Sequence, residues 1–181
     1  MREIETRIVD IDVEDIRKKL LNINAVKVKQ ENQINNIYDF SDKRLLTEKG
    51  YARIRIVEDE LNNKNLYYMT VKKLISQEKY KIMDENEVLI DNAQEGENIF
   101  KALGLHLVQS IKKYRESYKY KDTLVEIDIN DKSFCPFPYI EIETNCEEQL
   151  KEVVNLLGYS LEDTTSKTIY ELLQNKGIRG L

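Results

Sequence analysis

Pairs of like charges, separated by one intervening residue, recur along this chain, and the acidic pairs occupy different segments from the basic pairs. The six pairs are Glu3/Glu5, Arg53/Arg55, Glu85/Glu87, Lys113/Arg115, Glu126/Asp128 and Glu141/Glu143. Residues at positions i and i+2 of a β-strand share one face, so each pair would direct two like charges to the same side. Such an arrangement costs energy unless opposite charges compensate it.

The two kinds of pair suit two kinds of ligand. Carboxylates are hard oxygen ligands, and a cluster of them without imidazole or thiolate neighbours is typical of Mg²⁺ or Mn²⁺. The candidates for metal binding are Glu3, Glu5, Glu141 and Glu143. Guanidinium and ammonium groups bind phosphate oxygens, and the candidates here are Arg53, Arg55, Lys72, Lys113 and Arg115. Together they indicate phosphoryl chemistry, although no G-x-x-x-x-G-K-[ST] phosphate loop is present.

The composition of the chain excludes several classes of protein function. The chain has 181 residues, of which 41% are hydrophobic and 34% charged, which is typical of a globular protein. A single histidine, His106, is too few for most catalytic zinc sites or histidine-assisted nucleophiles, and we expect it to be solvated or to cap a helix. Cys135 and Cys146 are expected to be free thiols. The net charge of −5 argues against nucleic acid as the main partner. With no apolar segment long enough for a membrane and no signal sequence, we expect a cytoplasmic protein.

The charged pairs must be positioned by strands, because apolar residues alternate with them. The predicted strands are Arg2 to Val9, Val26 to Lys29, Gln33 to Phe40, Tyr51 to Glu58, Leu66 to Lys72, Tyr80 to Ile90, Ile111 to Tyr120, Thr123 to Asn130 and Tyr139 to Thr144. The predicted helices are Val13 to Asn22, Gln94 to Leu103, Glu147 to Leu157 and Ser166 to Asn175. We therefore expect one α+β domain over residues 1–181.

Two architectures agree with this alternation. In the first, a half-buried antiparallel sheet turns its charged face to water. In the second, the sheet closes into a barrel with a charged lumen, and amphipathic helices cover its apolar outer face. A solvated face usually mixes both signs along each strand, whereas here the signs are segregated, which favours the barrel.

The order of these motifs resembles that of the CYTH superfamily, the triphosphate tunnel metalloenzymes. Its signature strand E-x-E-x-K corresponds here to Glu3-Ile4-Glu5-Thr6-Arg7. Later family motifs are matched in order by Tyr38-Asp39-Phe40, Arg53-Ile54-Arg55, Thr70-Val71-Lys72, Lys113-Tyr114-Arg115, Asp128, Tyr139-Ile140-Glu141-Ile142-Glu143 and Ser166-Lys167-Thr168-Ile169-Tyr170. The resemblance implies an eight-stranded antiparallel β-barrel, the triphosphate tunnel, with amphipathic helices packed outside.

The resemblance also implies roles for individual residues. The expected metal ligands are Glu3, Glu5, Asp128, Glu141 and Glu143, with help from Glu126. Substrate phosphates would be bound by Arg53, Arg55, Lys72, Lys113, Arg115 and Lys167, and the expected catalytic residues are Glu3, Glu5, Arg7 and Lys72. Glu85 and Glu87 match further acidic residues of the family's lumen. Arg7 departs from the family lysine and, unlike lysine, cannot act as a titrating amine.

Three functions remain open from the sequence. The favoured one is a phosphohydrolase that uses Mg²⁺ or Mn²⁺ to cleave inorganic triphosphate, thiamine triphosphate or a nucleoside triphosphate. The second is a class IV adenylyl cyclase, which converts ATP to cyclic AMP and pyrophosphate; cyclases of this kind carry a histidine before the E-x-E strand, and this chain does not. The third is a non-enzymatic polyphosphate or nucleotide-binding module. In each case the partner is a triphosphate-containing small molecule, and a homodimer stays open.

Overall fold

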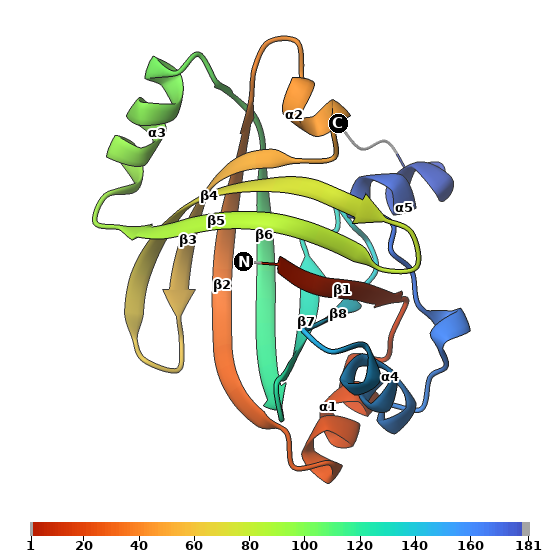
Figure 1. Ribbon diagram of the computed structural model, residues 1–181. Coiled ribbons are helices and arrows are strands. Elements are labelled where there is room, and N and C mark those ends of the chain that lie inside the picture. The colour runs from red at the N-terminus through yellow and green to blue at the C-terminus, as the bar shows by residue number, and fades with distance from the viewer. Residues whose placement is uncertain (1, 179–181) are drawn as a thin grey trace.

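The computed structural model describes residues 2–178, with the side chains of Arg2 and Glu3 outside the described part. Eight antiparallel strands form a closed barrel in the order β1-β5-β4-β3-β2-β6-β7-β8 (Figure 1). The strands are β1 (Arg2–Val9), β2 (Val26–Asp39), β3 (Tyr51–Asp59), β4 (Lys64–Gln77), β5 (Lys81–Ile90), β6 (His106–Tyr120), β7 (Thr123–Asn130) and β8 (Tyr139–Thr144). The predicted α+β barrel with helices around it is therefore confirmed.

Alternation along the strands sorts the side chains into an inner and an outer set. On β3, Arg53 and Arg55 face the lumen while Ala52 and Ile54, each 1% exposed, pack outside. The first strand closes the barrel, since β1 pairs with β5 on one side and with β8 on the other. Glu5 on β1 lies directly across from Glu143 on β8. Acidic residues from both ends of the sequence thus meet in one lumen, as the motif order predicted.

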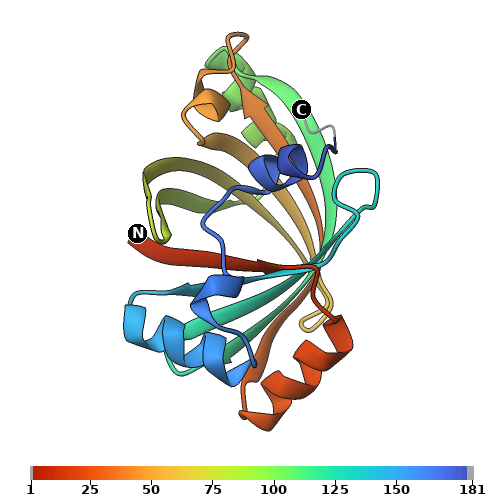
Figure 2. The ribbon, with the colours of Figure 1, turned by 90° about the vertical axis from the view of Figure 1, so that its right-hand side faces the viewer.

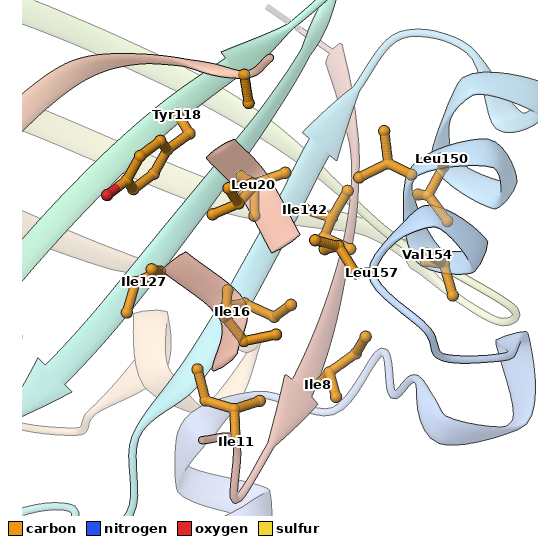
Figure 3. Close-up of a cluster of buried hydrophobic side chains, with 14 of the residues drawn as sticks. Ile8, Ile11, Ile16, Leu20, Tyr118, Ile127, Ile142, Leu150, Val154 and Leu157 are labelled. Carbon is orange, nitrogen blue, oxygen red and sulfur yellow. The ribbon is translucent and has the colours of Figure 1, made fainter. Parts of the chain in front are cut away.

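Helices α1 (Val13–Asn22) and α4 (Glu147–Leu156) cover the outer face of the barrel beside β7 and β8 (Figure 3). Ile16 and Leu20 of α1 are completely buried there, as is Leu150 of α4. Asp12 caps α1 by accepting a hydrogen bond from the Asp15 amide at 3.0 Å. This apolar layer packs on the sheet from outside the barrel.

The remaining helices lie toward the other end of the molecule in both ribbon views (Figures 1 and 2). Helix α3 (Ala93–Ala102) buries Phe100 against Tyr38 and Ile54. Helices α2 (Arg44–Thr47) and α5 (Ile169–Asn175) contribute residues to the lumen cavity, and a short 3₁₀ turn, Leu161–Asp163, precedes α5. None of the described helices has the length and apolar character that crossing a membrane would require.

A close backbone contact seats the segment after α2. A Cβ atom at Gly50 would lie 2.5 Å from the backbone oxygen of Lys72, which is closer than atoms can approach. Only glycine therefore lets this segment pack against β4 at the level of the Lys72 side chain.

Several predicted boundaries were wrong. The two segments Val26 to Lys29 and Gln33 to Phe40 are one strand, because Glu31 between them is buried on the same face as Gln33 and accepts a hydrogen bond from it. His106 is exposed, which agrees with the expectation of a solvated side chain, although it begins β6 rather than ending the preceding helix. The last helix begins at Ile169 behind its Thr168 cap, three residues later than expected, and α2 was not predicted at all.

Candidate active site

The lumen holds a cavity of about 1170 Å³. Among the described residues that line it, nine are basic and seven acidic. The cavity is therefore richer in positive charge although the whole chain carries −5. A cavity of this balance attracts an anion that brings some positive counter-charge with it.

The basic part of the wall is centred on β3. Arg55 Nη2 lies 2.9 Å from both carboxylate oxygens of Glu87, and Arg53 Nη2 lies 3.3 Å from one of them. Thr70 Oγ1 donates a hydrogen bond of 2.7 Å to the same carboxylate. Burial raises the pKa of Glu87, but the effects of Arg55, Thr70 and Arg53 outweigh it, and the pKa lies below its usual value. Glu87 thus occupies the position where two guanidinium groups converge, as a phosphate would.

Lys72 lies beside this group on β4. Its Nζ is 2.7 Å from Glu85 Oε2. Burial alone would lower the pKa of Lys72, but Tyr51 and nearby carboxylates, among them Glu85 and Glu143, raise it. Lys72 is therefore a charged amine placed between the basic row of β3 and the acidic residues of β8.

Asp128 is completely buried and saturated by cations. Arg115 binds it through Nε at 2.6 Å and Nη2 at 2.7 Å, and Lys113 Nζ adds a contact of 2.8 Å. Despite burial, Arg115 and Lys113 hold the pKa of Asp128 below its usual value. Asp128 is not among the residues that line the cavity, and its contacts orient the side chains of Arg115 and Lys113.

Arg7 and Lys81 saturate Glu5 in a similar way. Lys81 Nζ lies 2.5 Å from Glu5 Oε1, and Arg7 Nη2 contacts the same oxygen. Arg7 also binds Glu141 through Nε at 2.7 Å and the backbone oxygen of Lys167 through Nη1 at 2.8 Å. Because its planar group spans these partners, Arg7 connects β1 with β8 and with the segment that leads into α5.

A different arrangement exists at Glu126, Glu141 and Glu143. One carboxylate oxygen from each lies within 4.8 Å of the others. Glu126 contacts Arg115 and Ser117, and Glu141 contacts Arg7 and Arg115. Among the described side chains, Glu143 has no hydrogen-bond or ion-pair partner, and burial together with Glu126 raises its pKa to about 8. Three carboxylates that converge in this way, two of them buried and Glu143 half-buried, fit a divalent ion of the Mg²⁺ or Mn²⁺ type.

Most predicted site residues do converge on this cavity. Those that line it are Glu5, Arg7, Arg53, Arg55, Lys72, Lys113, Arg115, Glu141 and Glu143. Asp128 lies behind the wall, and the exposed side chain of Lys167 is not among the lining residues. The backbone of Glu3 pairs with Met83 of β5, but the Glu3 side chain lies outside the described part of the chain.

Lys81 was missed by the sequence reasoning. It is 6% exposed and faces Glu5 directly across the β1 and β5 pair. Burial and the charge of Arg7 lower its pKa, against the opposing effect of Glu5. The sequence did contain a signal for Lys81, because it lies an even number of residues from Glu85 and Glu87 and therefore shares their face of the strand. Charged and apolar residues alternate less regularly in this strand than in the others.

A sequence model of the CYTH domain matches residues 1–169. The chain belongs to the CYTH family. Among curated proteins, no significant match was found.

Solved structures of CYTH-like shape agree with this assignment. A conserved hypothetical protein from Pyrococcus furiosus is 26% identical, with a TM-score of 0.75 over 94% of this chain and 99% of that one. The PH1819 protein from Pyrococcus horikoshii is 23% identical, with a TM-score of 0.78 over 96% and 99%. A Hippeastrum protein, described as an adenylyl cyclase candidate with a dominant triphosphatase activity, is 16% identical, with a TM-score of 0.63 over 98% and 88%. At these identities the second and third show the shared fold alone.

Proposed function

We propose that this CYTH protein is a metal-dependent triphosphatase that cleaves a triphosphate inside its barrel. The observation that carries this proposal is the opposition of two lumen features. Arg53, Arg55 and Lys72 form a basic row on β3 and β4, and the carboxylates of Glu126, Glu141 and Glu143 cluster on β7 and β8. A linear polyphosphate would contact the basic row, and the acidic cluster would hold a divalent ion that supplies counter-charge for it.

The basic row would bind and orient the phosphates. The two guanidinium groups that now hold Glu87 match the planar geometry of phosphate oxygens. Lys72 adds a single mobile charge beside them, which can follow the charge that moves during phosphoryl transfer. Lys113 and Arg115 are held in place by Asp128, so their orientation does not depend on the ligand.

The acidic cluster would hold the metal. Glu126, Glu141 and Glu143 are the proposed ligands, and Glu5, with Glu3 on the same strand, would complete the site by releasing Arg7 or Lys81. A bound Mg²⁺ or Mn²⁺ would neutralise phosphate charge and favour ionisation of an attacking water. The barrel itself would exclude bulk water and so strengthen each of these interactions.

The test is a product analysis with three substrates. Tripolyphosphate, thiamine triphosphate and ATP are each incubated with Mg²⁺ and with Mn²⁺, and the products are resolved as phosphate, pyrophosphate and cyclic AMP. We expect metal-dependent release of phosphate that EDTA abolishes. Cyclic AMP with pyrophosphate from ATP would instead identify a cyclase, and binding without turnover of any substrate would indicate a binding module.

A further inference from the structure

Strand β5 supplies counter-ions to charged residues on other strands of the lumen. Glu85 contacts Lys72 Nζ at 2.7 Å, and Glu87 contacts Arg55 Nη2 at 2.9 Å. Lys81 belongs to the same inward row but carries the opposite charge. Beside the basic row, β5 therefore presents anions where we propose that phosphates bind, and beside β1 it presents a cation close to the proposed metal site.

Lys81 contacts one oxygen of Glu5 on β1. Its Nζ lies 2.5 Å from Glu5 Oε1, and the two residues are direct partners in the register of β1 and β5. Both side chains are 7% exposed. At the other edge of β1, Glu5 lies across from Glu143, a member of the acidic cluster. The Lys81 ammonium group therefore neutralises a carboxylate that is adjacent to the proposed metal site.

Two cations share Glu5, and they differ in how firmly they are held. Arg7 contacts the same oxygen, but it also binds Glu141 at 2.7 Å and the backbone oxygen of Lys167 at 2.8 Å. Among the described residues, Glu5 is the one side-chain partner of the Lys81 ammonium group. A compact ammonium group on a flexible stem of four carbons can also move more easily than a guanidinium group fixed by several partners. Lys81 is therefore the cation that Glu5 can release at the smaller cost.

A divalent ion would compete with Lys81 for Glu5. Burial raises the pKa of Glu5, but Arg7 and Lys81 outweigh this effect and hold the pKa below its usual value. A metal ion needs the carboxylate in this ionised form, yet it repels a neighbouring ammonium group, most strongly in a buried site where charges are poorly screened. Contact between the Glu5 oxygen and a metal ion therefore requires that the Lys81 ammonium group move away.

We propose that Lys81 is a resident counter-ion that competes with the divalent ion for Glu5 and thereby weakens the metal affinity of the empty barrel. The inference rests on the proposed metal site and adds to it a residue that opposes metal binding. In the metal-free protein Lys81 neutralises Glu5 and links β1 to β5, a pairing with four register pairs in the described part of the chain. On metal binding the ammonium group moves into the cavity that it already lines, where it faces the phosphates of the substrate.

The test is calorimetric titration of Mn²⁺, without any phosphate compound, into the wild type and two variants of equal charge. Lys81→Met removes the competing ammonium group, and the Kd for Mn²⁺ should decrease about tenfold, the lower end of the change caused by altering a group that contacts a metal ligand. Lys72→Met is the matched control, because it removes the same charge from the lumen while its partner, Glu85, is not a proposed ligand. Its Kd should differ from that of the wild type by less than about threefold, since a charge that does not touch a ligand acts from a greater distance.

Thermal unfolding provides a second measurement. Lys81→Met leaves a buried carboxylate with one cation fewer, so the metal-free variant should unfold at a lower temperature than the wild type. Because a tighter ligand stabilises the folded state more at the same concentration, a fixed excess of Mn²⁺ should raise the Tm of the variant by more than it raises that of the wild type. Lys81→Gln makes the same charge change with a polar end group and serves if the methionine variant does not fold.

Unchanged or weaker Mn²⁺ binding by Lys81→Met would overturn the inference, as would an equal gain in Lys72→Met, which would show a general effect of lumen charge. Absence of Mn²⁺ binding from every variant, the wild type included, would refute the proposed metal site and the competition with it. Mn²⁺ binding that changes as expected, without cleavage of any triphosphate, would refute the triphosphatase function and leave the competition supported.

Discussion

Asp128, which is completely buried, and Glu143, which is half-buried, are carboxylates on neighbouring strands, yet their surroundings are opposite. Asp128 accepts hydrogen bonds from Arg115 and Lys113, which hold its pKa low. Glu143 has no such partner among the described side chains, and its pKa is raised to about 8 by burial and by Glu126. The same alternation of charge thus produces one structural anion and one carboxyl group that its surroundings keep largely protonated at neutral pH.

The difference shows that a lumen carboxylate is identified by what lies across from it. Arg115 is the register partner of Asp128 on the neighbouring strand, so this ion pair forms as the sheet forms. Glu143 instead lies opposite Glu5 and Leu124, neither of which can neutralise it. We therefore expect mutations of the two residues to affect different properties.

The largest expected effect is on stability, from Asp128→Asn. This change leaves Arg115 and Lys113 buried with less negative charge to bind, and breaking a buried ion pair in this way costs about 3 to 5 kcal/mol of the free energy of unfolding. Urea denaturation of the metal-free protein measures the loss. A cost below about 1 kcal/mol would mean that Asp128 is not the structural anion described here.

Glu143→Gln should have the opposite signature. Because the pKa of about 8 keeps the Glu143 carboxyl largely protonated in the metal-free protein at pH 7, glutamine resembles the form already present, and the free energy of unfolding should stay constant or increase slightly. Turnover with saturating Mg²⁺ or Mn²⁺ should fall by more than about 100-fold, the upper end of the loss caused by removing a group that merely supports a metal ligand. Denaturation and steady-state kinetics on the same sample test both halves. A destabilised variant with normal kcat would reverse the distinction between the two carboxylates.

Lys72→Ala should weaken substrate binding and lower turnover together. A lumen cation stabilises both the bound phosphates and the charge of the transition state. The decrease in kcat/KM should therefore correspond to a loss of about 2 to 4 kcal/mol of transition-state stabilisation. Lys18, which is exposed on α1, provides the matched control, and Lys18→Ala should leave kcat/KM unchanged. Equal and small effects from the two variants would remove the main support for a basic phosphate site.

The smallest expected effect comes from Glu87→Gln. The Glu87 carboxylate holds Arg53 and Arg55 in the absence of ligand, so an incoming phosphate must displace it. The neutral variant binds these guanidinium groups less strongly, and KM should decrease by about fivefold, equivalent to about 1 kcal/mol, the scale of one net hydrogen bond. An increase in KM would instead show that Glu87 is needed to position the two arginines.

Much of the barrel could be predicted because a charged lumen leaves a pattern with a period of two. Arg53 and Arg55 around Ile54 specify both the strand and which face turns inward. The pattern failed in β2 at Gln30, Glu31 and Asn32, which lie outside the predicted strands, although Glu31 is only 6% exposed and accepts a hydrogen bond from Gln33. Polar residues that satisfy one another inside a barrel cannot be told from solvated ones without their cross-strand partners.

The individual roles of the site residues could not be predicted from the sequence for a related reason. Arg7 was expected to be a catalytic residue, and the structure places it between Glu5 and Glu141 and against the Lys167 backbone. The side chain of Lys167 is exposed. Only its backbone carbonyl contributes to the site, by accepting a hydrogen bond from Arg7. These distinctions depend on strand register and on distances of a few ångströms, which one sequence does not specify.

The closure of the barrel by its first strand has a consequence for how the chain folds. Arg7 and Glu141 are 134 positions apart, and neither side of β1 has a neighbouring strand that is adjacent in sequence. During synthesis β1 has no partner strand until β5 has left the ribosome, and its other edge stays open until β8 follows, whereas the hairpins β3–β4 and β6–β7 can form locally. Folding dominated by such distant pairing is slow, and we expect the exposed edges of β1 to be the segment most in need of chaperone protection in the nascent protein.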